Sequence, residues 1–435
     1  MRGRLITKFL LLVLAVLILL FVWKSLPIIS GYAAKVVASG VFVAGRPAKG
    51  VIRQDLLSFP ANWASCTVDE KDSSVTASVW GLARRKAIYR QGLGATLVSG
   101  SSEEEIRKQK VDLAVAPAVD QDTVDWPMGD RGYEGKGVDT AKMNAAVGLA
   151  YSGSGTRAVV VVYRGKIVAE RYAPGFDRHT RLTGWSMTKG VTSAMIGILA
   201  GQHRLDVKEP APVEQWQKDD RRRITVEDLL HMNSGLSWWE LYAGPADATR
   251  MLFEEEDMGK FAERSALRHS PGTVFNYSSG TANILSSIIR NRIGAGYYRW
   301  PYEQLFYKIG MYSAVLEPDA GGTYVGSSYC FATARDWARF GLLYLRDGVW
   351  EGQRVLPEGW VSYTRKGKGY GAMWWLNTDG KRFPGVPEDC FSCEGYEGQY
   401  VWVIPSRDLV VVRLAMEHGR RLGSAAFLKT VISAL

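Results

Sequence analysis

The pattern of apolar and polar positions differs between three parts of the chain. Fifteen apolar residues follow one another without interruption from Phe9 to Trp23. Residues 40–125 mix short β-rich runs with polar joints, whereas from about residue 140 onward the pattern becomes regular. The pattern therefore predicts three parts: a signal anchor or signal peptide (1–30), an appended N-terminal segment of unknown role (31–135) and one large domain (136–435).

The large domain begins and ends with β-rich hairpins. "RAVVVVYRGKIVAERYAPG" (157–175) gives two apolar runs about an Arg164-Gly165 turn, and "YVWVIPSRDLVVVRLA" (400–415) gives two more about a Pro-Ser-Arg-Asp turn. Between them the apolar period is mainly helical, as in "TVEDLLHM" and "TANILSSIIRNRIG". We therefore expect an α+β fold in which an antiparallel sheet, assembled from both ends of the domain, is flanked by helices and has a mainly helical region inserted.

Two polar stretches near the start of this domain predict their secondary structure less clearly. "SSEEEIRKQK" (101–110) is compatible with a short helix and with a solvated charge run, and we favour the charge run. "PMGDRGYEGKGVD" (127–139) is rich in glycine and charge, which is typical of a linker.

Composition places the chain among globular proteins. Apolar residues make up 46% of it and charged residues 23%, which excludes a polytopic membrane protein and a wholly disordered one. The formal charge of +10 is concentrated at one end, because residues 1–50 hold seven Lys or Arg and no acid. Since the rest of the chain carries only +3, we expect no nucleic-acid partner.

The N-terminal segment has the pattern of an export signal, with cationic residues before the apolar run. The run is short for a full membrane span of roughly 20 residues, but Leu5, Ile6 and a snorkelling Lys8 or Lys24 extend it. The pattern is compatible with a cleaved signal and with a retained anchor, and we favour the anchor, because bulky residues precede the small-x-small site ending at Ala33. The body then lies outside the cytoplasm, anchored to the inner membrane and periplasmic in a Gram-negative cell.

Cysteines and histidines indicate no metal site. The four cysteines, Cys66, Cys330, Cys390 and Cys393, allow three full pairings that the sequence does not rank. "CFSC" at 390–393 is half of a zinc site, but no second cysteine pair or nearby histidine completes it, so we expect neither a metal nor a cofactor. A Cys390–Cys393 disulfide and two free thiols are equally compatible with an exported protein.

Ser186 and Lys189, in "GWSMTKG", form the only Ser-x-x-Lys of the chain. On a helix, positions i and i+3 share a face, so the hydroxyl and the amine come within hydrogen-bond reach. A serine nucleophile needs a base, and a lysine serves as one when burial lowers its pKa, which the apolar run after Lys189 would supply. Taken alone, the motif is weak, and a serine that only caps a helix is the better interpretation.

Two later stretches carry further candidate chemistry. "HSPGTVFNYSSGTANILSSIIR" (269–290) places Tyr277 and Ser279 on a tight loop before a helix, from which a phenol can relay the proton of a serine. "FSCEGYEGQYVWVIP" (391–405) places Gly395 where a backbone N–H can approach a ligand closely, as an oxyanion hole requires. Each stretch alone is more often a buried tyrosine with a helix cap, or a glycine-rich turn without a ligand.

The combination, in this order, resembles the penicillin-recognising serine hydrolases: class C β-lactamases, D-amino-acid carboxypeptidases, related esterases and 6-aminohexanoate-dimer hydrolases. "ITVEDLLHMNSGL" (224–236) resembles the Leu-Leu-x-His-x-Ser-Gly-Leu element of the family, and "PGTVFNYSS" resembles its Pro-Gly-x-x-Phe-x-Tyr-Ser approach. The resemblance covers roughly residues 140–435. In this sequence the three family motifs fall on Ser186/Lys189, Tyr277/Ser279 and Cys393-Glu394-Gly395.

The resemblance implies a β-lactamase/transpeptidase-like fold and an acyl-enzyme mechanism. It makes Ser186 the nucleophile, Lys189 the base or proton relay, and Tyr277 the partner that activates water for deacylation. It also assigns supporting roles: the backbone N–H groups of Ser186 and Tyr396 would bind the oxyanion, and Ser279 and Gly395 would support the substrate.

Departures from the family pattern bear on the substrate. The third-motif lysine, which attracts the substrate carboxylate in β-lactamases and carboxypeptidases, is Cys393 here, and Glu394 after it would repel an anion. The second motif ends in Ser279 and not in Asn. We therefore expect a small-molecule ester or amide substrate, as in the esterase and 6-aminohexanoate-dimer hydrolase branch; the alternatives are a D-amino-acid carboxypeptidase or β-lactamase, and a non-catalytic binding or sensor domain. Six nearby aromatic residues are compatible with an apolar pocket and with core packing: Trp185, Trp238, Trp239, Tyr370, Trp374 and Trp375.

Overall fold

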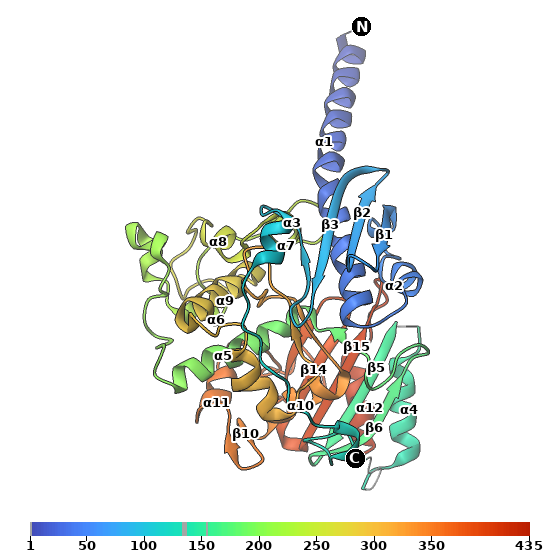
Figure 1. Cartoon of the computed structure of the whole chain (residues 1–435), viewed down its shortest axis with the longest axis vertical. Helices are drawn as coiled ribbons and strands as arrows, with labels where there is room; N and C mark the ends of the chain where they lie inside the picture. Colours follow the sequence, from blue (N-terminus) through green and yellow to red (C-terminus); the bar gives the residue numbers. More distant parts are fainter. Residues whose placement is uncertain (1, 133–136, 154) are drawn as a thin grey trace.

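A six-stranded antiparallel sheet forms the centre of the molecule (Figure 1). The computed structural model describes residues 2–132, 137–153 and 155–435. In sheet order the strands are β12 (Trp375–Leu376), β13 (Phe391–Gly395), β14 (Gln399–Ile404), β15 (Leu409–Ala415), β5 (Thr156–Tyr163) and β6 (Lys166–Tyr172). Because β15 pairs with β5, both ends of the large domain share one sheet, which confirms the α+β class and the sheet predicted from the two hairpins.

Helices cover both faces of this sheet. The side chains of β5 alternate between two cores: Val159 and Val161 belong to the core shared with α4 and α12, and Val160 and Val162 to the larger core shared with α5 and α10. A strand buried on both faces needs apolar residues at every position, which explains its uninterrupted valine run. The covering helices are α4 (Thr140–Ala150), α12 (Ser424–Ser433), α5 (Thr188–Gly201) and α10 (Ala334–Leu345).

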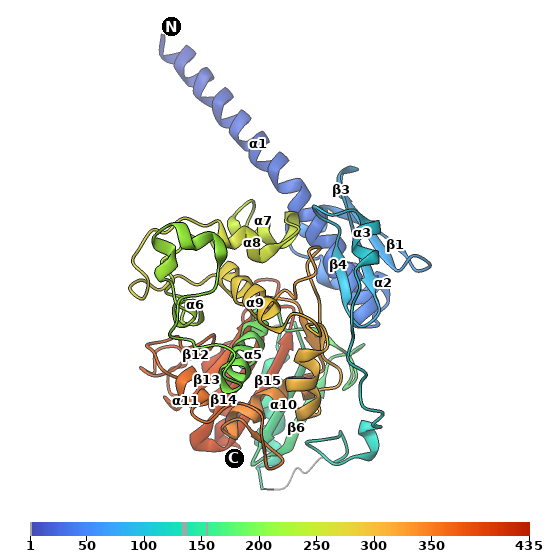
Figure 2. The same cartoon turned by 60° about the vertical axis from the view of Figure 1, so that its left-hand side comes forward.

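The inserted region is mainly helical, as predicted, and lies above one face of the sheet (Figure 2). Its helices are α6 (Val226–Leu230), α7 (Asp247–Glu254), α8 (Met258–Glu263) and α9 (Ser279–Ile293). Short strands accompany it: β7 (Leu182–Thr183), β8 (Val315–Leu316) and β9 (Cys330–Ala332) form one small sheet, and β10 (Val349–Trp350) pairs with β11 (Gln353–Arg354) before α11 (Trp360–Thr364). Helix α9 packs against α5, and this contact positions the candidate site.

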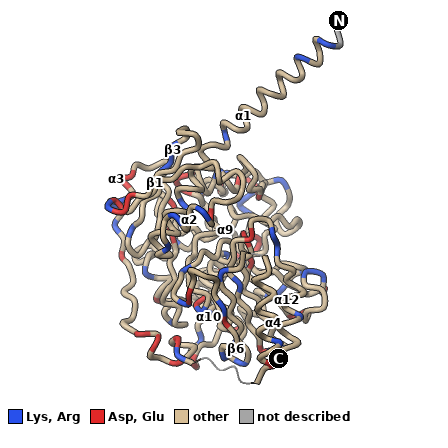
Figure 3. The backbone as a smooth tube through the Cα atoms, turned by 90° about the vertical axis from the view of Figure 1, so that its right-hand side faces the viewer, with Lys and Arg blue, Asp and Glu red and all other residues tan. Residues whose placement is uncertain are grey.

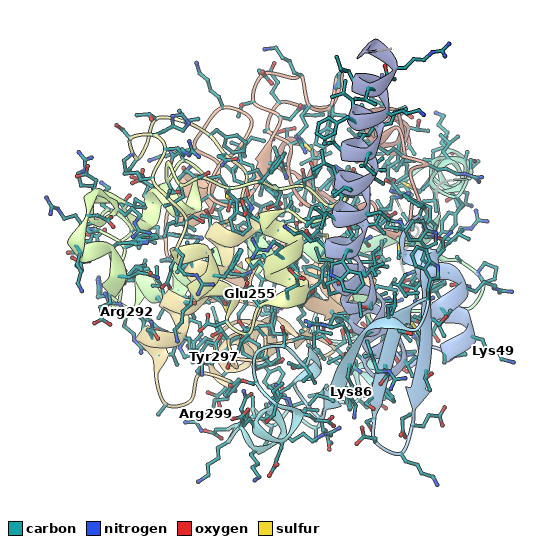
Figure 4. The ribbon with its side chains drawn as sticks, turned by 90° about the horizontal axis from the view of Figure 1, so that it is seen from above. Lys49, Lys86, Glu255, Arg292, Tyr297 and Arg299 are labelled. Atoms are coloured by element: carbon teal, nitrogen blue, oxygen red, sulfur yellow. The ribbon has the colours of Figure 1, made fainter. Side chains whose placement is uncertain are left out.

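The appended segment forms a small module beside the inserted region. Four antiparallel strands follow one another in sheet order: β1 (Ala64–Asp69), β2 (Ser74–Val79), β3 (Leu82–Arg90) and β4 (Gly94–Leu97). Helix α1 (Arg2–Ala38) packs across this sheet and also against α7, and α2 (Ala48–Asp55) follows it. Seen from above, α1 stands between β3, marked by Lys86, and the α7–α8 connection, marked by Glu255 (Figure 4).

The acidic stretch at 101–110 is a helix and not a solvated charge run. Helix α3 (Glu103–Lys108) begins with a capping box in which the Ser102 hydroxyl accepts from the Glu105 N–H and the Glu105 carboxylate accepts from the Ser102 N–H. The helix buries one apolar side chain of its own, that of Ile106. The capping box and the one buried apolar side chain stabilise a short helix, although its polar composition favoured a solvated charge run.

Helix α1 has two parts with opposite environments. Its large apolar side chains are exposed as far as Trp23, whereas Ala33, Ala34 and Val37 are fully buried in the body of the protein. Figure 3 shows the exposed part as an almost uncharged rod between cationic positions. By length and composition this helix could cross a membrane, and a signal sequence passes the same test. The helix continues without a break past the boundary expected at residue 30.

A buried ion pair ties α1 to the large domain. Lys35 Nζ is paired with the Glu317 carboxylate and lies 2.9 Å from Ser39 Oγ. The carboxylate also accepts from the Ser39 hydroxyl (2.9 Å) and the Ala95 N–H (2.7 Å). One carboxylate thus joins the end of α1, β4 and the inserted region.

The stretch expected as a linker is bound to α10 where the structure describes it. Arg339 donates to the Gly129 carbonyl and to the Asp130 carboxylate, each at 2.6 Å. Residues 133–136, with the expected domain boundary at 135, lie outside the described residues.

Candidate active site

Ser186 lies in a 3-10 turn, η4 (Trp185–Met187), directly before α5. Trp185 has a left-handed φ of 45°, which is costly for a residue with a side chain and turns the backbone sharply at this point. The Thr188 hydroxyl donates to the Trp185 carbonyl (2.7 Å) and fixes the turn. As a result the half-buried Ser186 stands at the N-terminal end of α5, where the helix dipole favours negative charge.

Lys189, one turn further, is buried with 1% exposure beneath Ser186. Its Nζ lies 2.9 Å from Ser186 Oγ, 3.0 Å from Ser279 Oγ and 3.1 Å from the Ser327 carbonyl oxygen. Burial lowers the pKa of Lys189 to about 8, although the negative charge of Glu240 acts in the opposite direction. The serine predicted as nucleophile is therefore in contact with a lysine that is partly neutral near physiological pH.

The second motif faces this pair from the start of α9. The Ser278 hydroxyl caps the helix by accepting from the Thr281 N–H (2.9 Å). Its neighbours, Tyr277 and Ser279, face the site. The Lys189 ammonium lies 4.8 Å from the centre of the Tyr277 ring, which places this ring beside the Ser186–Lys189 pair. Burial, and then the charge of Glu240, raise the pKa of Tyr277, so its phenol stays protonated.

Glu240 completes the cluster, although no motif in the sequence pointed to it. Its carboxylate accepts from the Ser279 hydroxyl (2.5 Å) and the Ser279 N–H (2.9 Å). It also accepts from the Trp238 indole (2.6 Å) and the Tyr242 phenol (2.7 Å). The sequence does contain one signal for it, a single acid inside the aromatic run "WWELY". A carboxylate among apolar residues needs polar partners, which suggests a specific role.

The third motif approaches Ser186 through its glycine. A Cβ placed on Gly395 would lie 2.1 Å from the carbonyl oxygen of Gly184, so only glycine lets β13 come this close to the turn that carries Ser186. The next residue, Tyr396, has its ring 5.9 Å from that of Trp185. Gln399 holds the turn by donating to the Tyr396 carbonyl at 3.0 Å. The backbone of Tyr396 therefore lies beside the 3-10 turn, where an oxyanion donor is needed.

The other two residues of that motif face away from each other. The Cys393 sulfur packs against α5, where a Cβ on Gly190 would come within 2.2 Å of it. Glu394, on the opposite face, receives two hydrogen bonds from Arg382 (2.7 and 2.5 Å) and one from Ser392 (2.8 Å). The guanidinium compensates the carboxylate, which weakens the expectation that Glu394 repels anions.

The cysteines are free thiols in the described structure. Cys390 and Cys393 are both buried, and burial raises the pKa of each. The disulfide that the sequence left open is therefore absent between them, and the Gly395 turn is held by Gln399 and by close packing.

The six aromatic residues have four kinds of environment. Trp374 is fully buried core, while Trp239 is 67% exposed. Tyr370 and Trp375 pack around the Tyr277 ring, with centroid distances of 5.9 and 5.4 Å. Trp185 and Trp238 lie next to the site, and Trp238 orients Glu240.

One group of possible metal ligands occurs among the described residues: Asp122, Asp130 and His179. Its carboxylates are already paired, Asp130 with Arg339 (2.6 Å) and Asp122 with Arg178 (3.1 Å). The two guanidinium groups already balance the charge of these carboxylates, so the group carries no argument for a metal ion.

Comparisons with known proteins agree with the fold and identify the family. The family model described as Beta-lactamase matches residues 142–426. Over 292 residues, 60% of this chain and 72% of the relative, the chain is 27% identical to 6-aminohexanoate-dimer hydrolase from Paenarthrobacter ureafaciens. It is 29% identical over 180 residues to D-aminopeptidase from Brucella anthropi, a match that covers 39% of this chain and 34% of the relative. A solved structure, a putative 6-aminohexanoate-dimer hydrolase from Bacillus anthracis, shares the fold with a TM-score of 0.56 at 23% identity, over 64% of this chain and 78% of its own.

Proposed function

We propose that this chain, which belongs to the beta-lactamase family, cleaves an ester or amide bond through an acyl-enzyme on Ser186. The observation that carries the proposal is the 2.9 Å contact between Ser186 Oγ and the buried Lys189 Nζ. A serine hydroxyl becomes nucleophilic when an adjacent base accepts its proton, and a lysine with a pKa of about 8 supplies that base.

The contacts of Lys189 orient its lone pair. The Ser327 carbonyl can only accept a hydrogen bond, and the Ser279 hydroxyl directs its own proton to the Glu240 carboxylate. Both groups must therefore accept N–H bonds from Lys189. In the neutral amine the remaining direction, toward Ser186 Oγ, is left for the lone pair.

Acylation follows from this arrangement. Lys189 takes the proton of Ser186 as Oγ attacks the scissile carbonyl carbon, and the backbone N–H groups of Ser186 and Tyr396 stabilise the oxyanion. When the intermediate collapses, the bond to the leaving group breaks and the acyl group stays on Ser186. The proton passes from Lys189, through the Tyr277 phenol, to the leaving alcohol or amine.

Deacylation repeats the steps with water. A water molecule takes the place of the leaving group and attacks the acyl carbon. Its proton passes through the Tyr277 phenol to the neutral amine of Lys189. The ester bond to Ser186 breaks, and Oγ recovers its proton from Lys189. Ser279 and Glu240 touch no reacting atom in this scheme and act by positioning Lys189.

The substrate that we propose is an ester or an amide without an essential carboxylate. The cation nearest the third motif, Arg382, is engaged by Glu394, and Cys393 faces α5. The similarity to 6-aminohexanoate-dimer hydrolase supports an amide or ester substrate. A second candidate function is that of a peptidase acting on D-amino acids. The shorter match to D-aminopeptidase supports this candidate.

We also propose that α1 is a retained membrane anchor and that the large domain lies outside the cytoplasm. Cleavage after Ala33 would remove Ile28 and Ile29, which are 6% and 7% exposed and belong to the folded body. The cationic residues before the apolar run favour a cytoplasmic N-terminus.

Covalent labelling tests the proposal. A fluorophosphonate probe should label the full-length wild type and leave Ser186→Ala unlabelled, with both proteins shown to be folded by thermal unfolding. Equal labelling of both would refute an acyl-enzyme on Ser186, and no labelling of either would favour a non-catalytic domain. Turnover of D-alanyl peptides or of a chromogenic cephalosporin, abolished by Ser186→Ala, would favour the second candidate.

A further inference from the structure

A cavity of about 530 Å³ lies between α1 and the large domain. Its volume is within the range of small-molecule sites. One wall is a single face of α1, with the spacing i, i+1, i+4, i+7, i+8, i+11. The residues of this face are Phe21, Val22, Ser25, Ile28, Ile29 and Tyr32.

The opposite wall belongs to the candidate active site. Trp185, Tyr242 and Tyr396 line it, and the rings of Tyr242 and Tyr396 stack with their centres 5.4 Å apart. Trp185 precedes the nucleophile, and the Tyr242 hydroxyl lies 3.5 Å from Ser279 Oγ. One layer of aromatic side chains therefore separates the cavity from the catalytic cluster. The Tyr242 phenol is held by Glu240 (2.7 Å), whereas Tyr396 is 42% exposed, so a shift of the Tyr396 side chain would open this layer.

The polar groups at one end of the cavity are already satisfied. The His418 ring bonds Ser58 Oγ (2.6 Å) and the Gln54 carbonyl (2.7 Å), and the Glu397 carboxylate accepts from the backbone N–H of His418 (2.6 Å). Asp55 is paired with Arg46 at 2.6 Å. These groups have their own partners, so the cavity suits an apolar occupant.

The cavity lies at the level where α1 leaves the body. Side chains of α1 are mostly exposed up to Lys24 and buried from Ser25, so the cavity face straddles this change. The exposed part measures roughly 30 Å, the thickness of a bilayer core. Other exposed apolar side chains lie in segments that line or adjoin the cavity: Leu57, Phe59, Trp239 and Leu241. Figures 1 and 4 show α1 leaving the body between the β1–β4 sheet and the α7–α8 part of the inserted region.

We infer that this cavity binds the aliphatic chain of the substrate, and that the substrate is a membrane-borne amphiphile, an ester or amide with a long acyl or alkyl chain. The inference deepens the proposed function and depends on it. Such a molecule would place its scissile carbonyl at Ser186 and its chain beside α1, which would carry the chain between bilayer and site without exposing it to water.

Chain-length selectivity in the full-length protein, reconstituted in phosphatidylcholine vesicles, tests the inference. Ser25→Trp places a large ring in the cavity, and Leu19→Trp places the same ring on an exposed part of α1 outside it. The substrates are nitrophenyl butyrate and nitrophenyl palmitate, and in a second series butyl and hexadecyl acetate. Each variant is compared with the wild type by the ratio of kcat/KM for the long and short substrate.

Ser25→Trp should lower this ratio at least tenfold in one of the two series, and the series affected identifies whether the acyl or the alcohol chain occupies the cavity. Leu19→Trp should keep the wild-type ratio. Val22→Trp, at a partly exposed position, provides a second variant if Ser25→Trp does not fold. Unchanged ratios in both series for the folded cavity variants would overturn the inference. A wild type that hydrolyses none of the four esters would instead count against the proposed function.

Discussion

Among the residues that the structure describes, two lysines are almost fully buried, one in α1 and one in α5, and their surroundings differ. Lys35 is 3% exposed, is paired with the Glu317 carboxylate and lies 4.1 Å from the centre of the Tyr329 ring. Lys189 is 1% exposed, and the three oxygens that it contacts are uncharged. The carboxylate nearest to it in the network, Glu240, is one hydroxyl group away.

This difference separates a structural lysine from a chemical one. A carboxylate in direct contact with a lysine forms an ion pair, and the Lys35–Glu317 pair holds two parts of the chain together. A carboxylate that acts through a hydroxyl orients the amine without contacting it, and burial lowers the pKa of Lys189 to about 8. Changes that exchange or remove these partners test the comparison.

The largest effect is expected at Lys189. Lys189→Ala should lower the rate of Ser186 acylation by about 10³- to 10⁴-fold, because the serine loses its base. Lys189→Arg should be as inactive, since a guanidinium keeps the charge but does not give up its proton. Stopped-flow labelling with a fluorophosphonate measures the rate, and near-normal acylation by either variant would remove Lys189 from the mechanism.

The next effect is expected at Lys35 and concerns stability. Lys35→Met leaves the Glu317 carboxylate buried without its cation, which should lower the free energy of unfolding by about 3 kcal/mol. The double variant Lys35→Met/Glu317→Gln should recover part of this loss, because the unpaired charge is gone. Chemical denaturation in detergent measures both, and the activity per folded molecule should change little. A large loss of activity without a loss of stability would contradict the structural role.

The smallest effect is expected at Glu240 and appears in the pH profile. In the wild type kcat/KM should rise with pH and level off above about 8, because the neutral form of Lys189 is the base. Glu240 raises the pKa of Lys189, so Glu240→Gln should move the rising limb to lower pH. It should also lower the plateau by about tenfold, the equivalent of one hydrogen bond, since the Ser279 hydroxyl is held less firmly. A limb that moves to higher pH would contradict the assigned electrostatics.

Local patterns predicted those parts of the fold and site that are encoded locally. The valine run before Arg164-Gly165 and the apolar residues after it predicted a hairpin, and the i, i+3 spacing placed Ser186 and Lys189 on one face. The family resemblance, which depends on the order of the motifs, added Tyr277 and Gly395. The structure places Tyr277 beside Lys189, and Gly395 beside the turn that carries Ser186.

The remaining parts depend on contacts between distant segments. The role of Glu240 follows from its contact with Ser279, 39 residues away, and no spacing rule connects the two. The pairing of Glu394 with Arg382 has the same origin, and without it the carboxylate was taken for a repelling charge. That α1 forms one wall of a cavity follows from how it packs, and its composition alone does not distinguish this from a plain anchor.

The unbroken course of α1 also determines how the protein would search for substrate. A flexible tether lets a domain sample a volume set by its length, whereas a continuous helix holds the domain at one height and in one orientation. With its last turns built into the core, α1 joins the exposed rod to the body that holds the catalytic cluster as one helix, which includes Pro27. The search would then become two-dimensional, so that turnover depends on the density of substrate within the surface that holds the helix and little on its concentration in the surrounding solution.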